Sequence, residues 1–91
     1  MDIRKLFGLN LRRLRLAADL SQEAVAERMG VDRAHVSSME RGQQNVTLVT
    51  IWQAAQALGC RAANLLDEDA AAKSAGPSST AKAPRRKRTK A

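Results

Sequence analysis

Two short helical segments joined by a very short connection constrain the fold of this chain more than any other feature. Residues 22–29 and 33–41 are each about two helical turns long, and only Gly30, Val31 and Asp32 separate them. Helices of this length are not stable alone in water. They must therefore pack on each other and on neighbouring helices, which predicts a compact all-α domain.

Three further helices are expected around this pair. The first spans about residues 3–18, and the last runs from about Arg61 to Leu66. The fourth follows Thr47 and stops at Gly59. Its apolar stripe is expected to face the core and consists of Leu48, Ile51, Trp52, Ala55 and Leu58; the alternative for Trp52 is contact with a ligand or partner. Helix caps are expected from side chains that can accept a backbone N–H, namely Asp2, Ser21, Asp32 and Thr47.

The charge of the chain is divided unevenly along its length. The formal net charge is +7, yet residues 1–69 contain nine basic and nine acidic residues. Residues 70–91 contain seven basic residues, no acidic residue and no large aliphatic or aromatic side chain. Such a segment cannot bury enough apolar area to offset the entropy of ordering it. We therefore expect a folded domain at 1–69 and a disordered basic tail at 70–91, which either attracts nucleic acid or only improves solubility.

Several functional classes are disfavoured by what the sequence lacks. Cys60 and His35 are the only cysteine and histidine, so an internal disulfide or a multi-cysteine zinc site cannot form; Cys60 is expected to be a small buried hydrophobe. We find no nucleophile–base pair, metal set or phosphate loop, and expect no enzyme, cofactor or metal. With no apolar run of roughly 20 residues and no secretory signal, we expect a cytoplasmic protein without membrane contact.

The segment 33–41 is anchored by only two sizeable apolar residues, Val36 and Met39. Its other face carries short or hydrogen-bonding side chains, whereas a helix meant only for solvent more often carries Glu and Lys. A helix that must approach another surface closely needs short side chains and a few long donors. The major groove of B-DNA, about 12 Å wide, admits such a helix.

Seven spaced positions carry a family resemblance: Gln22, Ala26, Gly30, Val36, Ser37, Glu40 and Gly42, in the pattern Q-x3-A-x3-G-x5-V-S-x2-E-x-G. The chain resembles the phage repressor/Cro-like (XRE-type) helix-turn-helix family over roughly residues 3–67. The resemblance implies a compact five-helix repressor-like domain and a sequence-specific, DNA-binding transcriptional regulator. It also implies that residues 33–41 form the recognition helix, which enters the major groove by its N-terminal end.

The resemblance assigns roles to individual residues. Those implied to face base edges are Arg33, Ala34, Ser37 and Ser38. Arg33 is the best candidate because a guanidinium can donate two bonds to guanine O6 and N7, and Ala34 suits a thymine methyl. Those implied to lie near the DNA backbone are Gln22, His35, Arg41 and Asn45. Arg15 and Glu40 match a buried ion pair that joins the third helix to the first, and we interpret Glu40 as structural.

Two residues depart from the family pattern. Asp19 stands where many relatives have a left-handed glycine, a conformation that aspartate tolerates less well. Asp32 caps the recognition helix where serine or threonine is usual. Its carboxylate either weakens affinity for nearby phosphates or accepts a hydrogen bond from a cytosine amino group.

The expected partner is double-stranded DNA, bound by a homodimer on a partly palindromic operator, because one contact set of three or four bases gives poor specificity. No small-molecule ligand is expected. The alternative is a transcription adaptor that uses the same domain to bind protein and does not read DNA sequence. Leu65 and Leu66 either close the core or extend into a dimer surface.

Overall fold

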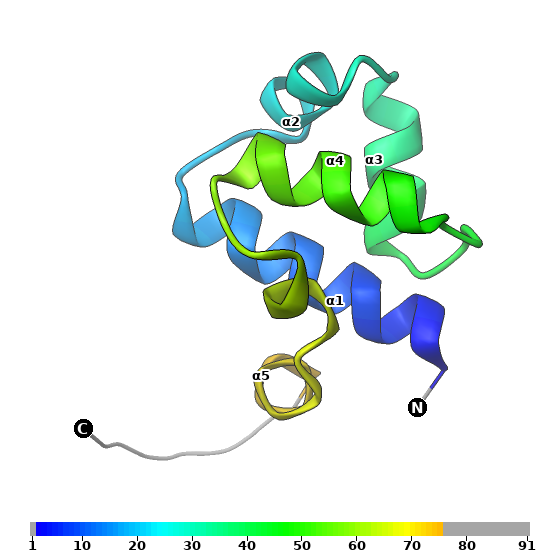
Figure 1. Ribbon diagram of the computed structural model, residues 1–91, viewed down its shortest axis with the longest axis vertical. Coiled ribbons are helices and arrows are strands. Elements are labelled where there is room, and N and C mark those ends of the chain that lie inside the picture. The colour runs from blue at the N-terminus through cyan, green and yellow to red at the C-terminus, as the bar shows by residue number, and fades with distance from the viewer. Residues whose placement is uncertain (1, 76–91) are drawn as a thin grey trace.

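The computed structural model describes residues 2–75, and all of its regular elements there are helical. The elements are α1 (Ile3–Ala17), α2 (Gln22–Met29), α3 (Arg33–Glu40), α4 (Leu48–Leu58), the 3-10 helix η1 (Ala62–Leu66) and α5 (Glu68–Ala75) (Figure 1). The all-α fold is confirmed, and the first four helices lie within one residue of their predicted bounds. The fifth predicted helix is η1, and α5 follows it.

Side-chain caps define three of the helix starts. Asp2, Ser21 and Thr47 each accept a hydrogen bond from a backbone N–H of the first helical turn. The guanidinium of Arg4 also bonds Asp2 and lowers the pKa of that carboxyl to about 2. Asp32 precedes α3 with extended backbone, but its side chain makes no capping bond, contrary to expectation.

The turn between α1 and α2 contains Asp19, one of the two residues that depart from the family pattern. Asp19 has φ of 58° and is the only non-glycine residue with positive φ among residues 2–75. Aspartate tolerates the left-handed region better than most residues with a Cβ, although glycine adopts it at lower cost. The turn therefore keeps its geometry with aspartate in place.

The core lies between α1, α2, α3, α4 and η1. Its largest fully buried side chains are Phe7, Leu11, Val25, Val36, Met39 and Leu65. Leu65 closes the core below α4, whereas Leu66 points partly outward and is 39% exposed. Arg28 joins α2 to the end of α4, where its Nη1 donates to the carbonyl oxygen of Ala57 at 2.8 Å.

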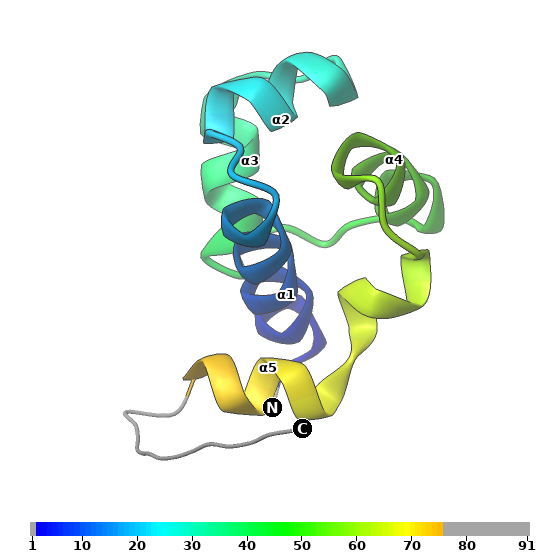
Figure 2. The same cartoon turned by 90° about the vertical axis from the view of Figure 1, so that its left-hand side faces the viewer.

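The prediction that Trp52 packs in the core is wrong, because its side chain is 60% exposed. Leu48, at the start of the same stripe, is 84% exposed. The buried face of α4 is instead made largely of its alanines, together with Leu58. In the views of Figures 1 and 2, the first turns of α4 have no helix over their outer side. The stripe is therefore divided between core and surface.

The backbones of α1 and α3 approach each other at glycines. A Cβ on Gly8 would lie 2.5 Å from the carbonyl oxygen of Met39 and 2.6 Å from that of Glu40. A Cβ on Gly42 would lie 2.9 Å from Cα of Lys5. The C-terminal end of α3 and the turn after it therefore rest directly on α1.

Folded structure continues beyond Asp69, where the tail was expected to begin. Helix α5 packs across α1 with Ala71 fully buried (Figure 2). Asn10 is also fully buried, and its Nδ2 donates to the carbonyl oxygens of Leu65 and Asp67 at 3.0 Å each. Small alanines suffice for this contact, which is why residues 70–75 are helical without large apolar side chains. The rest of the expected tail, residues 76–91, lies outside the described residues.

None of the helices in residues 2–75 combines the length and apolar character needed to cross a membrane.

Candidate nucleic-acid interface

The outward face of α3 is formed by residues that recur at helical spacing. Val36 and Met39 are buried, so the opposite face points away from the body. Ala34, Ser37, Ser38 and Arg41 follow at positions i, i+3, i+4 and i+7. Ala34 is exposed and the two serines are half-buried. The face is therefore shallow, with short side chains along its middle.

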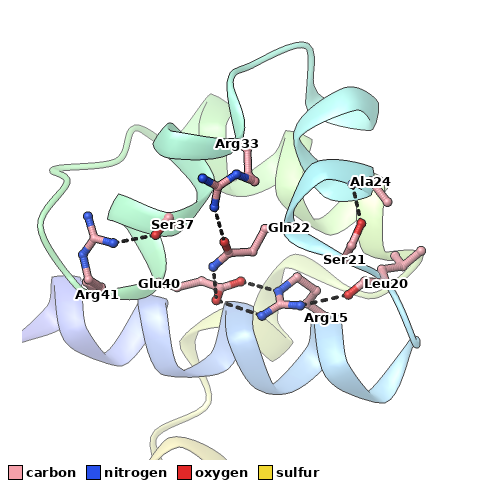
Figure 3. A network of polar contacts seen from close by, with 9 residues as sticks. All are labelled: Arg15, Leu20, Ser21, Gln22, Ala24, Arg33, Ser37, Glu40 and Arg41. Atoms are coloured by element: carbon pink, nitrogen blue, oxygen red, sulfur yellow. Dashed lines mark hydrogen bonds and ion pairs between the residues drawn. The ribbon is translucent and has the colours of Figure 1, made fainter.

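Arg33 stands at the first turn of α3 and is exposed. Its Nη1 donates to Oε1 of Gln22 at 3.3 Å, a contact that joins the first residue of α3 to the first residue of α2 (Figure 3). A guanidinium has five N–H donors, so this contact leaves others for a ligand. The arrangement orients Arg33 beside the N-terminus of α2.

Gln22 is turned toward the protein as well as toward Arg33. Its Nε2 donates to Oε1 of Glu40 at 3.1 Å. Glu40, a hydrogen-bond acceptor when ionised, requires the NH2 group on its side, which leaves the Gln22 carbonyl to accept from Arg33. The amide nitrogen has a second hydrogen that this contact does not use.

Glu40 and Arg15 form a bidentate ion pair in the interior. Arg15 Nε donates to Glu40 Oε2 at 2.6 Å, and Arg15 Nη2 donates to Oε1 at 3.2 Å. The side chain of Glu40 is only 4% exposed and that of Arg15 only 11%. Arg15 Nη1 also donates to the carbonyl oxygen of Leu20 at 2.9 Å. The pair thus connects α3 to α1 and to the turn before α2 (Figure 3).

The second half of α3 is linked to the loop that follows it. Arg41 donates from Nη1 to Oγ of Ser37 and from Nη2 to Oε1 of Gln43 at 3.2 Å. Gln44 Nε2 donates to Oγ of Ser38 at 2.7 Å. Both serine oxygens are acceptors here, so each hydroxyl hydrogen remains a possible donor.

Two of the predicted backbone-contacting residues lie at the margins. His35 is half-buried and borders a hollow formed with the turn Gly30–Val31–Asp32. Asn45 is exposed in the loop after α3 and borders a separate hollow between α1, α4 and η1. The structure therefore brings Arg33, Gln22, Glu40 and Arg15 together, with Ser37, Ser38 and Arg41 farther along α3.

Sequence reasoning missed three residues that shape this surface. Gln43 and Gln44 hold Arg41 and Ser38, and the only signal was a polar loop after the helix. Gly8 permits the close contact between α1 and α3. Its signal was a glycine inside an otherwise regular helical pattern, where glycine is less favourable than alanine.

Comparison with known proteins places this geometry in a family. The helix-turn-helix family HTH_3 matches residues 11–65, more than half of the chain. The chain belongs to the HTH_3 helix-turn-helix family. It is a DNA-binding transcriptional regulator of this class, and α2 and α3 are its helix-turn-helix unit.

Similar proteins include regulators from several bacteria. An uncharacterized HTH-type transcriptional regulator, y4dJ of Sinorhizobium fredii, is 49% identical over 59 residues, covering 65% of this chain and 77% of that protein. The control protein C.BamHI of Bacillus amyloliquefaciens is 40% identical over 67 residues, covering 72% and 83%. The crystal structure of the restriction–modification controller protein C.AhdI from Aeromonas hydrophila superposes with a TM-score of 0.65 at 47% identity, covering 68% of this chain and 94% of that one.

Cys60 and the possible metal ligands in residues 2–75 form no arrangement comparable to the one around α3. Burial raises the pKa of the Cys60 thiol, while the charge of Arg13 lowers it; a protonated thiol is a poor nucleophile and metal ligand. Within residues 2–75, no three or more His, Cys, Asp or Glu side chains are grouped as metal ligands would be.

Proposed function

We propose that this HTH_3 protein is a sequence-specific regulator that binds a partly palindromic operator as a homodimer, with the N-terminal end of α3 in the major groove. The observation that carries the proposal is the shallow outward face of α3, with exposed Arg33 at its leading end. In this class, a dimer meets half-sites about 34 Å apart, one helical turn of DNA. Doubling the contacts supplies the specificity that one short helix lacks.

Base reading is proposed for Arg33, Ala34, Ser37 and Ser38. The contact with Gln22 orients the Arg33 guanidinium before DNA arrives, which lowers the ordering cost of a bidentate contact with guanine. The serine hydroxyls can still donate to base acceptors. Each serine oxygen already accepts one hydrogen bond, Ser37 from Arg41 and Ser38 from Gln44.

Backbone contacts are proposed for Gln22, Arg41, His35 and Asn45. The unused hydrogen of Gln22 Nε2 and the N-terminus of α2 together suit a phosphate. Arg41 keeps its positive charge near the C-terminal end of α3, where it can reach a neighbouring phosphate. His35 borders the turn between α2 and α3, Asn45 lies in the loop after α3, and both would extend the contact along the backbone.

Selection of bound sequences from a random DNA pool, with wild type and with Arg33→Ala, tests this function. Wild type is expected to yield one preferred motif. Arg33→Ala is expected to relax preference at one base position and to weaken binding to the selected DNA by about 1–3 kcal/mol. Arg61→Ala, an exposed arginine on the η1 side of the molecule, is the matched control and should leave the motif unchanged.

The alternative function, an adaptor that binds protein and does not read DNA sequence, gives a different result in that selection. An adaptor would retain random DNA and selected DNA equally, and Arg33→Ala would change only overall affinity. A pool that does not converge would reject the sequence-specific proposal.

The basic segment after α5 is proposed to supply much of the non-specific attraction to DNA. Residues 76–91 contain six basic and no acidic residues, whereas residues 2–75 contain ten basic and nine acidic ones. Deleting residues 76–91 is expected to flatten the dependence of log binding constant on log salt, by about 0.9 for each phosphate that the shortened chain no longer neutralises. Binding titrations at several salt concentrations measure this slope.

A full-length control separates charge from length in the same titrations. Replacing the six basic residues of 76–91 by glutamine should flatten the slope as much as the deletion does. An unchanged slope in both variants would leave solubility as the role of this segment. Ending the chain after Ala75 rather than at Asp69 keeps Ala71 in its buried position.

We further propose that the protein acts in the cytoplasm, on bacterial or phage DNA, and that it is not an enzyme and needs no cofactor or small-molecule ligand. The support is that its relatives are named as transcriptional regulators and control proteins.

A further inference from the structure

Two exposed cations lie on α1 beside its contact with α3. They are Lys5 and Arg12, here called the basic edge. The ion pairs within residues 2–75 are Arg4–Asp2 and Arg15–Glu40, so neither member of the basic edge has a counter-ion in that part of the chain. Exposed cations are ordinary on a protein surface. Their position decides whether they can take part in binding.

Helical geometry places the basic edge on the outer side of the contact between α1 and α3. Gly8 and Arg15 meet α3, and Phe7 and Leu11 are buried in the core. Since each residue of an α-helix turns by about 100°, the side that meets α3 lies about 70° around α1 from the side that meets the core. The two members of the basic edge each precede a residue of the α3 side by three positions. They therefore lie about 130° from the core in the same sense.

The outward face of α3 lies on this same side of the molecule. Val36 and Met39 turn the inner face of α3 toward the core, so its opposite face and the basic edge both lie on the side of the α1–α3 contact that is remote from the core. Figure 3 shows α1 along the border of the network that contains Arg33 and Arg15. The proposed DNA-binding surface therefore continues from α3 onto α1.

Lys5 rests against the turn that follows α3. A Cβ on Gly42 would lie 2.7 Å from Cγ of Lys5 and 2.9 Å from its Cα, so the lysine side chain begins directly beside this glycine. Arg41, the residue before Gly42, is exposed and is proposed above to contact a phosphate. No acidic residue follows it before Asp67. Two cations from different helical elements therefore lie at one turn.

We infer that Lys5 and Arg12 bind phosphates of the DNA strand that borders the groove occupied by α3. The inference rests on the proposed function only in placing the outward face of α3 against DNA. Lysine and arginine neutralise phosphates with release of counterions, and such contacts carry no base preference. The seven residues from Lys5 to Arg12 rise by about 10 Å along α1, which is about three nucleotide steps of one strand. Each cation can therefore bind a phosphate of its own.

Binding titrations at several salt concentrations, on selected and on random DNA, test the basic edge with Lys5→Gln, Arg12→Gln and the double variant. Each single variant is expected to reduce the slope of log binding constant against log salt by about 0.9, and the double variant by about twice that. A fourfold rise in salt would then cost a single variant about 3-fold less affinity than it costs wild type. The selected motif should not change.

Arg61→Gln is the matched control, because it removes the same charge from an exposed arginine on the η1 side of the molecule. It should keep the wild-type slope. Glutamine has nearly the helix propensity of lysine and arginine, so the α1 variants should fold as wild type does, which circular dichroism checks. Slopes for Lys5→Gln and Arg12→Gln that equal the slope of Arg61→Gln would overturn the inference.

Neutral phosphates locate the two contacts on the DNA. Single phosphates of the selected DNA are replaced by methylphosphonate, which carries no charge, and wild-type binding should weaken at several positions. One of these positions should lose its effect in Lys5→Gln and another in Arg12→Gln, as interacting pairs do in a double-mutant cycle. Reduced slopes without such a loss at any single phosphate would also overturn the inference. A random pool that does not converge would instead reject sequence-specific reading, and the slopes on random DNA would still decide the role of the basic edge.

Discussion

Glu40→Ala is expected to lower the free energy of unfolding by about 3–5 kcal/mol, because it leaves the guanidinium of Arg15 buried without its counter-charge. Arg15 and Glu40 are both largely shielded from solvent, and two hydrogen bonds join them. The substitution also removes the acceptor of the Gln22 amide. Urea unfolding followed by circular dichroism measures the change.

A matched comparison comes from the other ion pair in the described part of the chain. Arg4 and Asp2 have the same chemistry, but their side chains are 43% and 36% exposed. Arg4→Ala breaks this pair without removing the cap, since the cap uses the backbone N–H of Arg4. Its cost should be small beside that of Glu40→Ala, as for surface ion pairs generally. Equal costs for Arg4→Ala and Glu40→Ala would contradict the role given to the buried pair.

Glu40→Ala should also weaken DNA binding, at temperatures where the variant remains folded. Glu40 fixes Gln22, and Gln22 in turn holds Arg33. Loss of the carboxylate therefore affects the orientation of a proposed base-reading residue that it never touches. Affinity for the selected operator should fall. The slope of log binding constant against log salt, which reflects the number of phosphate contacts, should change less than the affinity does.

Gly8→Ala is expected to destabilise the protein by about 1–3 kcal/mol, the usual cost of overpacking. Helix propensity alone predicts the opposite sign, since alanine in a helix interior is favoured over glycine by about 1 kcal/mol. The new Cβ would meet the carbonyl oxygens of Met39 and Glu40 at 2.5 and 2.6 Å. These are backbone atoms, so they cannot move aside by a change of rotamer. Thermal and urea unfolding give the sign directly.

Gly30→Ala is the informative control for Gly8→Ala, because it is expected to cost stability through backbone strain rather than through a steric clash. A Cβ at Gly30 meets nothing within 4 Å, but the residue has φ of +74°. Alanine there should cost about 1–2 kcal/mol through backbone strain alone, without moving α3. Gly8→Ala should additionally weaken binding to the selected DNA. A neutral or stabilising Gly8→Ala would show that α1 and α3 separate easily.

Most of the fold could be predicted because its signals are local. Ser21 and Thr47 are strong cap residues, and both act as caps. Gly30 and Gly59 end their helices in the left-handed conformation that glycine favours. The apolar positions of the first helix recur at helical spacing, and Phe7 and Leu11 are buried. These features depend on a few neighbouring residues, which a sequence displays directly.

The features that were missed depend on contacts between distant parts of the chain. Trp52 was assigned to the core because it lies on an apolar stripe, yet the stripe continues past the edge of the neighbouring helices. Helix α5 was missed because alanines rather than large apolar groups hold it against α1. The residues of the interface could be proposed from the family pattern, but the inward orientation of Gln22 could not, since it requires Glu40 to lie beside it.

The contact of α1 with the end of α3 at Gly8 and the following turn at Gly42 leaves no layer of side chains to absorb displacement. A displacement of α3 is therefore expected to be transmitted to α1, so that the two helices move together. In the homodimer proposed above, operators with different spacers between their half-sites could then not be matched by tilting α3 within a subunit. The adjustment would have to come from the contact between the proposed subunits or from bending of the duplex, whose stiffness depends on sequence. Spacer sequence would then affect affinity although no side chain reads it.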